Sequence, residues 1–402
     1  MFVLVIGAGV GAYIYTNNML NRLNKIDVDK DKLGIVDVDG YVNFLVMGVD
    51  SRDMNDSKGS RTDALILISL EEKTNKVKLT SIYRDTMLKI GDSDKYDKIT
   101  HAFAYGGPAN TVKSINQSMD INIDKFVVIN WKTVVDMINA AGGVTLNIED
   151  YEIDEMNQCT EETANVVGDG KYTPVTRSGK QTVDGYQAVG YGRMRYGVGD
   201  DIKRTERMRT VIEALLKKLK KSSPKKIDKV MKTTLPLIKT NIEKRDILSL
   251  ATRVPKFKVT KSDSFPYEYT GGMIDGVYYL IPNTLKESVI DLHKKVFGQK
   301  VYKPSQKVKH ISEKIENIAN GSNYVIDPTI VPPKNDEPEE NNNNINNEQT
   351  QSKPKVDKPT PEPQPQPTPD PQPQPKPDPQ PEQPPEDPPT PSQGDSQTNP
   401  AG

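Results

Sequence analysis

The chain has 402 residues, of which 54 are lysine or arginine and 55 are aspartate or glutamate, and its formal net charge is −1. This balance argues against a nucleic-acid-binding protein, which usually contains a strongly basic domain. The single cysteine excludes an internal disulfide framework, and the three histidines lie too far apart in the sequence for a local zinc motif. A bound metal would therefore have carboxylate ligands, which favour magnesium, manganese or calcium.

The chain begins with an uncharged and largely apolar segment that extends to residue 18. Its apolar run of about 15 residues is shorter than the roughly 20 that a spanning helix needs, and no basic residue precedes it. We predict that residues 1–18 belong to a transmembrane anchor whose true start lies upstream, and that residues 19–40 form a linker. A buried N-terminal strand or helix is the alternative interpretation.

Residues 41–303 are predicted to form one α/β domain, because apolar runs alternate with amphipathic stretches over about 260 residues. Several of the apolar runs are continuous, which favours a sheet that helices cover on both faces. Strands are predicted over residues 41–50, 64–70, 76–85, 126–130, 143–148 and 276–281. Helices are predicted over residues 109–119, 131–143, 200–221, 227–237, 244–252 and 283–298.

Two regions are too polar to contribute to a core. Residues 151–176 contain Cys159 and show no clear periodicity, so we interpret them as an insertion or flexible loop. Residues 304–402 are predicted to be a linker and a disordered tail, rich first in asparagine and then in proline. The proline repeats favour an extended polyproline II spacer, which could thread through a cell wall.

Charged residues of opposite sign recur where the first three predicted strands begin or end. Asp50 and Arg52 follow the first strand, Arg61 and Asp63 precede the second, and Arg84 and Asp85 end the third. Ligands of open α/β proteins bind at strand ends, so three such pairs indicate a binding site. Solvated ion pairs in surface turns, each of little energetic value, are the alternative.

A cluster of arginines stands out in a chain that otherwise prefers lysine. The segment "GRMRYGVGDDIKRTERMR" contains Arg193, Arg195, Arg204, Arg207 and Arg209. If "GRMR" is a strand, Arg193 and Arg195 share one face, and Arg204 and Arg207 lie near each other at the start of the next helix. These four could surround one anion, whereas Arg209 should form a surface ion pair with Glu213. So many guanidinium groups, each able to donate two hydrogen bonds, suit a diphosphate. Asp50 and Asp63 could hold a magnesium ion against that diphosphate.

Seven motifs occur in order that together resemble the LytR–CpsA–Psr family of bacterial cell-wall assembly proteins. They are "NFLVMGVDSRD", "SRTDALILISL", "VKLTSIYRDT", "KITHAFAYGGP", "INAAGGVTLNI", "QTVDGYQAVGYGRMR" and "DDIKRTERMRTVIEALLKK". The resemblance is clear from Tyr41 to Leu219. Met208 stands where the family often has glutamine, so we assign it no function.

The resemblance implies an α/β/α sandwich with a central mixed sheet, held outside a Gram-positive type cell membrane by one N-terminal anchor. It implies a transferase that moves a glycopolymer, with one phosphate, from an undecaprenyl diphosphate carrier to a peptidoglycan hydroxyl. The polymer would be a wall teichoic acid, a capsular polysaccharide or a similar chain. An apolar tunnel would hold the lipid.

The same resemblance assigns roles to individual residues. Asp50 and Asp63 would bind magnesium, with manganese as a possible substitute. Catalysis would depend on Arg84, Arg193 and Arg195. The mechanism that follows also needs a general base, for which an aspartate near the metal, Asp63 or Asp85, is the candidate. The diphosphate would be bound by Arg61, Arg84, Arg193, Arg195, Arg204 and Arg207.

Two other functions use the same residues. A metal-dependent pyrophosphatase acting on polyprenyl diphosphates would transfer the phosphate to water instead of peptidoglycan. A non-catalytic wall-binding or regulatory protein would bind the lipid-linked polymer without turning it over.

Overall fold

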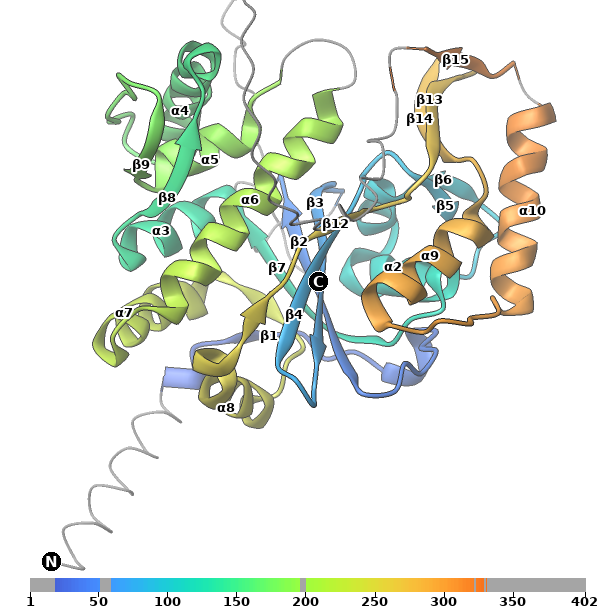
Figure 1. Ribbon diagram of the computed structural model, residues 1–402, viewed down its shortest axis with the longest axis horizontal. Helices are drawn as coiled ribbons and strands as arrows, with labels where there is room; N and C mark the ends of the chain where they lie inside the picture. The colour runs from blue at the N-terminus through green and yellow to red at the C-terminus, as the bar shows by residue number, and fades with distance from the viewer. Residues whose placement is uncertain (1–18, 51–58, 196–199, 322, 329, 331–402) are drawn as a thin grey trace, which may run out of the picture. The chain divides into compact units, whose positions relative to one another are not determined.

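The computed structural model describes residues 19–50, 59–195, 200–321, 323–328 and 330. Within these residues an eight-stranded sheet forms the centre of the fold (Figure 1). Its strand order is β1-β10-β7-β2-β3-β4-β11, and β12 also pairs with β4. The strands are β1 (Asn24–Lys25), β2 (Tyr41–Val49), β3 (Thr62–Glu71), β4 (Lys76–Ile82), β7 (Ile123–Asn130), β10 (Lys239–Thr240), β11 (Lys258–Val259) and β12 (Asp263–Phe265).

Both directions of strand pairing occur in this sheet. β3 is antiparallel to β2 and β4, whereas β2 is parallel to β7, and β4 is parallel to β11 and β12. Successive side chains of β2 face two different apolar cores, with Leu45 and Met47 in one and Val46 against the other. The predicted α/β fold with a central mixed sheet is therefore confirmed.

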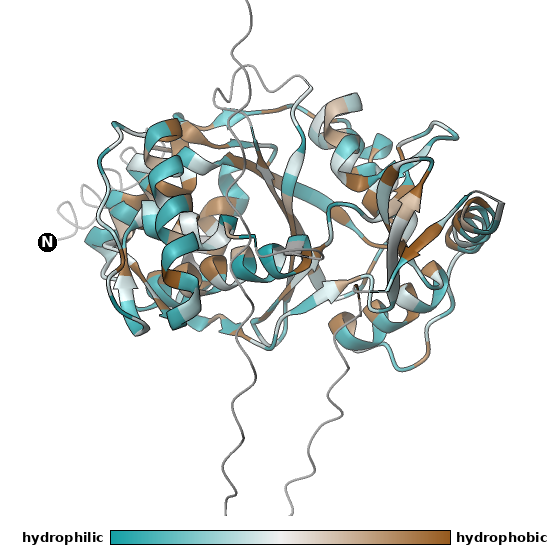
Figure 2. Ribbon diagram, turned by 90° about the horizontal axis from the view of Figure 1, so that it is seen from above, coloured by the Kyte–Doolittle hydropathy of each residue, from teal (hydrophilic) through white to brown (hydrophobic). Residues whose placement is uncertain are grey.

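Helices cover both faces of the sheet (Figure 1). Helices α2, α9 and α10 pack on the face of Leu45 and Met47, and the remaining long helices pack on the opposite face. In Figure 2 the strands in the middle are largely hydrophobic and the helices have mixed hydropathy, because each helix buries one side. The helices are α2 (Ile99–Met119), α3 (Trp131–Ala141), α4 (Ile153–Val167), α5 (Gly185–Arg193), α6 (Asp200–Lys220), α7 (Pro224–Thr234), α8 (Lys244–Arg253), α9 (Leu285–Phe297) and α10 (Gln306–Gly321).

Two of the predicted strands, over residues 143–148 and 276–281, form outside the central sheet. They belong to small antiparallel sheets that join segments close in sequence. The small sheets pair β8 (Val144–Ile148) with β9 (Gly179–Val183), β5 (Met87–Lys89) with β6 (Tyr96–Lys98), and β13 (Tyr269–Ile274) with both β14 (Val277–Pro282) and β15 (Val325–Asp327).

The prediction of an insertion or flexible loop over residues 151–176 was wrong for most of that segment. Residues 153–167 form α4, with Met156, Cys159 and Ala164 buried against the domain. The inner face of this helix also contains threonines, which obscured its apolar period. Their hydroxyls are satisfied within the helix, since Thr160 Oγ1 donates to the carbonyl of Met156 and Thr163 Oγ1 to that of Cys159, both at 2.6 Å.

The predicted linkers on either side of residues 41–303 also belong to the folded domain. In residues 19–40, Leu20, Leu33 and Val38 are buried, and β1 pairs with β10. After residue 303, α10 buries Val308 and Ile311 in the main core. In α10 the spacing of Val308, Ile311 and Ile315 is that of one helical face, so the sequence did contain a signal for this helix. Leu20, Leu33 and Val38 follow no such period, and their burial depends on partners distant in sequence.

The predicted anchor over residues 1–18 and the proline-rich tail from residue 331 onward lie outside the described residues. Among the helices that the structure describes, none combines the length and the apolar character needed to cross a bilayer.

Because α10 packs on the main core, we predict that two substitutions in this helix change the free energy of unfolding by different amounts. Ile311→Ala should lower the free energy of unfolding by about 2–4 kcal/mol, because it leaves a cavity in the main core. Glu313→Ala, at an exposed position of the same helix, should change it by less than about 0.5 kcal/mol. Urea unfolding of both variants measures the difference, and equal stabilities would show that α10 does not contribute to the core.

Candidate active site

The described members of the three charged pairs predicted at strand ends, Asp50, Arg61, Asp63, Arg84 and Asp85, lie at one end of the sheet. Since β3 is antiparallel to β2 and β4, its first residues lie beside the last residues of both neighbours. The backbone amide of Arg61 donates to Asp50 Oδ1 at 3.1 Å, and the amide of Asp50 donates to the carbonyl of Arg61. Arg52 lies outside the described residues.

Two carboxylates hold three of the predicted arginines at this end of the sheet. Arg84 Nη1 lies 2.5 Å from Asp63 Oδ1, and Arg204 Nη1 lies 3.8 Å from Asp63 Oδ2. Asp201 faces the same group, at 3.3 Å from Arg84, 3.3 Å from Arg195 and 3.2 Å from Arg204. Asp85 also lies 3.5 Å from Arg84, so three carboxylates face the three guanidinium groups, and a further anion would bind to the hydrogen-bond donors that these contacts leave unused.

The electrostatics of the cluster follow from this crowding. Burial opposes the ionisation of Asp201, but Arg204, Arg84 and Arg195 outweigh it and hold the pKa of that carboxyl below its usual value. Burial lowers the pKa of Arg204, although Asp63 opposes the change. Arg204 is only 4% exposed, and among the described residues its Nη2 has no hydrogen-bond partner. A buried guanidinium donor without a partner is costly, and a phosphate oxygen would satisfy it.

A pocket of about 420 Å³ opens beside the cluster. Five of the predicted site residues line it, namely Asp50, Asp63, Arg193, Arg195 and Arg204. The other four predicted residues, Arg61, Arg84, Asp85 and Arg207, do not line it. Arg84 forms an ion pair with Asp63, which does line the pocket. Asp85 lies behind Arg84, with its carboxylate 3.5 Å from Arg84 Nε and 3.1 Å from Lys98 Nζ.

The expected strand at "GRMR" is not formed, although both of its arginines reach the pocket. Arg193 is the last residue of α5, a helix that begins with a capping box between Asp184 and Gln187. The guanidinium of Arg193 donates to Thr163 Oγ1 at 2.7 Å, and the backbone amide of Arg195 donates to Glu155 Oε1 at 3.4 Å. The Asp-x-x-Gln spacing before the helix was the sequence signal that could have corrected this assignment.

The arginines of α6 divide among three directions. Arg204 lines the pocket, whereas Arg207 is buried below it, where Nε lies 3.3 Å from Glu152 Oε1 and Nη1 donates to the carbonyl of Met194. The prediction that Arg207 joins the other three around one anion therefore does not match its position. The predicted surface ion pair of Arg209 is also wrong, because Arg209 donates to Ser264 Oγ at 2.6 Å and to the carbonyl of Asp263.

One wall of the pocket comes from residues that the sequence did not single out. Helix α4 contributes Glu155, Gln158, Cys159 and Glu162, which share one helical face, and α3 contributes Trp131. Burial raises the pKa of the Cys159 thiol to about 11, so this cysteine is a poor nucleophile at neutral pH. The i, i+3, i+4, i+7 spacing of the α4 residues would have indicated a polar helical face.

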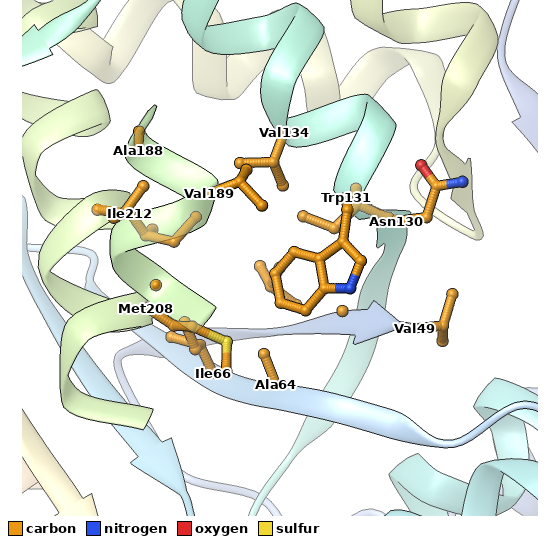
Figure 3. Close-up of a pocket in the computed structure, with 15 residues that line it drawn as sticks. Val49, Ala64, Ile66, Asn130, Trp131, Val134, Ala188, Val189, Met208 and Ile212 are labelled. Atoms are coloured by element: carbon orange, nitrogen blue, oxygen red, sulfur yellow. The ribbon is translucent and has the colours of Figure 1, made fainter. Parts of the chain in front are cut away.

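Trp131 also borders a smaller apolar pocket of about 40 Å³, which Figure 3 shows between the sheet, α3, α5 and α6. The figure places its indole between Val49 and Ala64 of the strands and the aliphatic side chains of the helices. Met208 lines this apolar pocket and does not line the charged one. Charged and apolar pockets therefore adjoin, with Trp131 in both linings.

Asp50 and Asp63 are the residues best suited to hold a metal. Both are carboxylates that line the charged pocket, and Mg²⁺ prefers such oxygen ligands. No group of three or more histidines, cysteines, aspartates and glutamates that could hold a metal is found in the described part of the chain. This donor set fits Mg²⁺ that completes its coordination with water and with phosphate oxygens of a substrate.

The buried pair of Arg207 and Glu152 predicts a loss of stability on substitution. Arg207→Met should lower the free energy of unfolding by about 3–5 kcal/mol, because it leaves the buried carboxylate of Glu152 unpaired. The double variant Arg207→Met/Glu152→Gln should recover part of that loss, since no isolated charge remains. Denaturant unfolding of both variants tests this, and a single variant as stable as the parent chain would contradict it.

Comparison with known proteins gives a consistent result. The model of the LytR_cpsA_psr family matches residues 9–295. An uncharacterized protein of Staphylococcus aureus is 30% identical over 60% of this chain and 58% of its own length. The polyisoprenyl-teichoic acid–peptidoglycan teichoic acid transferase TagT of Bacillus subtilis is 30% identical over 71% of this chain and 88% of its own.

A similar structure is also known. The crystal structure of protein gbs0355 from Streptococcus agalactiae is 28% identical and superimposes with a TM-score of 0.55, covering 66% of this chain and 90% of that chain. The match to the family extends over most of the folded domain, from the first strand to the last turn of α9. The chain belongs to the LytR–CpsA–Psr family.

Proposed function

We propose that this protein transfers a glycopolymer, together with one phosphate, from a polyprenyl diphosphate carrier to a hydroxyl of peptidoglycan. The observation that supports it most directly is the junction at Trp131 between an apolar pocket and a charged pocket that contains Arg193, Arg195 and Arg204 beside four carboxylates. A lipid diphosphate has the same two parts, an anion and a hydrocarbon chain. The relative TagT is named as a transferase of polyisoprenyl-linked teichoic acid to peptidoglycan, which is the same class of reaction.

The charged pocket would bind the diphosphate. Arg195 and Arg204 present guanidinium groups that can each donate two hydrogen bonds to phosphate oxygens, and Arg204 has a buried donor without a partner. Arg193 lines the same pocket from the end of α5. Arg84 would move little, because Asp63, Asp85 and Asp201 hold it on three sides. Arg61, whose side chain is exposed at the mouth of the β2–β3 connection, would bind the outer phosphate.

The apolar pocket would receive the lipid chain. Its lining comes from the sheet residues Val49, Ala64 and Ile66 on one side and from α5 and α6 on the other. Its volume is small, so α5 and α6 would have to separate from the sheet for a long polyprenyl chain to enter. The lipid would then pack against Trp131 and Met208, and these contacts would replace those that the two side chains now make with other residues of the pocket lining.

The transfer would be an in-line displacement at the phosphorus linked to the polymer. The acceptor hydroxyl forms the new P–O bond, the bond to the bridging oxygen breaks, and polyprenyl phosphate leaves. The arginines stabilise negative charge on the leaving phosphate. The proton of the hydroxyl needs a carboxylate as its acceptor. Asp63, a predicted base, is paired with Arg84 and Arg204, so Glu155 of α4, which lines the same pocket, is the better candidate.

Asp85 fits a different role from the one expected. Its carboxylate contacts Lys98 and Arg84 and does not line the pocket, so we propose that Asp85 positions Arg84. Asp50 and Asp63 would hold Mg²⁺, or Mn²⁺ in its place, and the bound ion would offset charge on the diphosphate. Attachment to the outer face of a cell membrane through residues 1–18, with a tail that threads into the wall, is part of the same proposal.

The transfer should depend on the clustered arginines, both on Arg195 in the pocket and on Arg84 behind Asp63. We expect Arg84→Ala and Arg195→Ala each to lower turnover about 10²–10³-fold, as loss of one oxyanion donor does. Arg245→Ala is the matched control, because this arginine is exposed on α8, and it should leave turnover unchanged. The assay uses the full chain, magnesium, a short-chain polyprenyl-diphosphate saccharide and peptidoglycan oligomers, with the products identified by mass spectrometry.

The products of the same assay separate the alternative functions. A saccharide joined to peptidoglycan through a phosphodiester establishes the transferase. Saccharide phosphate released equally with and without peptidoglycan would instead identify a pyrophosphatase. Lipid binding without turnover would identify a binding or regulatory protein.

Removal of divalent metal should abolish the transfer, and added Mg²⁺ should restore it. Asp50→Asn should raise the Mg²⁺ concentration needed for half-maximal turnover at least tenfold, because one of two carboxylate ligands is lost. Asp27→Asn, at a solvated position outside the pocket, should not change that concentration. Full turnover in EDTA would rule out the metal in the proposed reaction.

A further inference from the structure

A second pocket, of about 320 Å³, lies at the opposite end of the central sheet from the charged cluster. We call it the basal pocket. It forms where β2 and β4 begin and β3 ends, beneath the last turn of α9. Its lining consists of Tyr41, Ser69, Glu71, Lys76, Lys78, Thr260, Lys261, Lys295, Val296 and Gly298.

The pocket forms because one face of the sheet changes from apolar to polar at this end. Leu45 pairs with Leu67 in the main core, but two residues along the strands the row is Asn43, Ser69 and Lys78. The side chains of this polar row leave the apolar layer under α9 incomplete. Lys78 closes part of the gap, since its Nζ donates to the carbonyl of Lys295 at 2.7 Å.

Four of the lining residues are lysines, in a chain whose net charge is close to zero. Within the described residues, Lys76, Lys78 and Lys261 have no carboxylate within ion-pair distance. Lys295 has one, Asp291 at 3.3 Å, and its ammonium also lies over the ring of Tyr267. Glu71 is the acidic residue of the lining, and one of its oxygens accepts a hydrogen bond from Thr74.

Ser69 provides an independent sign of a ligand. It is 1% exposed and lines the pocket, yet its Oγ has no hydrogen-bond partner among the described residues. A hydroxyl buried without a partner costs about 1–3 kcal/mol, so such groups normally bind something. A hydroxyl donor surrounded by ammonium groups matches the requirements of a phosphate, whose oxygens accept from both.

We propose that the basal pocket binds a phosphate group, either that of a soluble phosphate ester or that of the headgroup of an anionic phospholipid. Lys76, Lys78, Lys261 and Ser69 would contact its oxygens. The proposal is independent of the transfer reaction, because Ser69 lies six residues along β3 from Asp63, a separation of roughly 20 Å. No group at the basal pocket can therefore reach a diphosphate held by Arg195 and Arg204.

The test measures binding of two probes to the full chain. Calorimetry with glycerol 3-phosphate examines the soluble source, and sedimentation with phosphatidylcholine vesicles, with and without phosphatidylglycerol, examines the lipid source. The variant Lys76→Gln/Lys261→Gln removes two exposed charges from the pocket. Lys294→Gln/Lys300→Gln removes two exposed charges close by but outside it, so it controls for net charge. Ser69→Ala removes one hydroxyl and leaves every charge in place.

We expect the pocket variant to bind at least one of the two probes tenfold or more weakly, and Ser69→Ala to bind that probe about fivefold more weakly. The control variant should bind as the parent chain does, and the probe that shows this pattern identifies the source of the phosphate. Equal weakening in the pocket and control variants would overturn the proposal, because it would show general attraction between charges. Unchanged binding of both probes in the pocket variant would overturn it as well.

Discussion

The arrangement of the candidate active site depends on one balance of charge, that of Asp63 and Asp201 against Arg84, Arg195 and Arg204. Burying Arg204, and most of Arg84, without counter-charges would cost more than packing can offset, whereas Arg195 stays exposed. The two carboxylates remove most of that cost, and they do so without satisfying every donor, as the free Nη2 of Arg204 shows among the described residues. The site is therefore held in shape before a substrate arrives, and an incoming diphosphate meets donors that are already oriented.

The position of this cluster gives it access to an apolar surface. The antiparallel pairing of β3 with β2 and β4 brings three strand ends together, and two of these strands, β2 and β3, also line the apolar pocket. Trp131 stands at the start of α3, where Asn130 caps the helix by accepting a hydrogen bond from the amide of Thr133. This cap fixes the indole at the border of both pockets. The opposite wall comes from α4, so a helix that looks like a loop in the sequence supplies half of the polar lining.

This site and the basal pocket lie at opposite ends of the same central strands. Residues two apart along a strand share a face, so the face that is apolar at Leu45 and Leu67 becomes polar at Asn43 and Ser69. The central sheet thus presents cationic side chains at both ends, with arginines at one and lysines at the other. Arginine suits the bidentate grip of a reacting diphosphate, whereas lysine suits a looser contact with a single phosphate.

The sequence by itself determined the four long strands of the central sheet (β2, β3, β4 and β7), the amphipathic helix α6, the family and the grouping of charges at three strand ends. These features depend on local periodicity, and a strand that is apolar over its whole length has few alternatives to a central position. Tertiary structure decided which charges meet. Arg204 and Arg207 are three residues apart on one helix, yet one lines the pocket and the other is paired with Glu152, because their neighbours come from distant segments. The same holds for α4, for α10 and for the basal pocket, whose residues come from four segments between Tyr41 and Gly298. Their function depends on proximity that only the folded sheet creates.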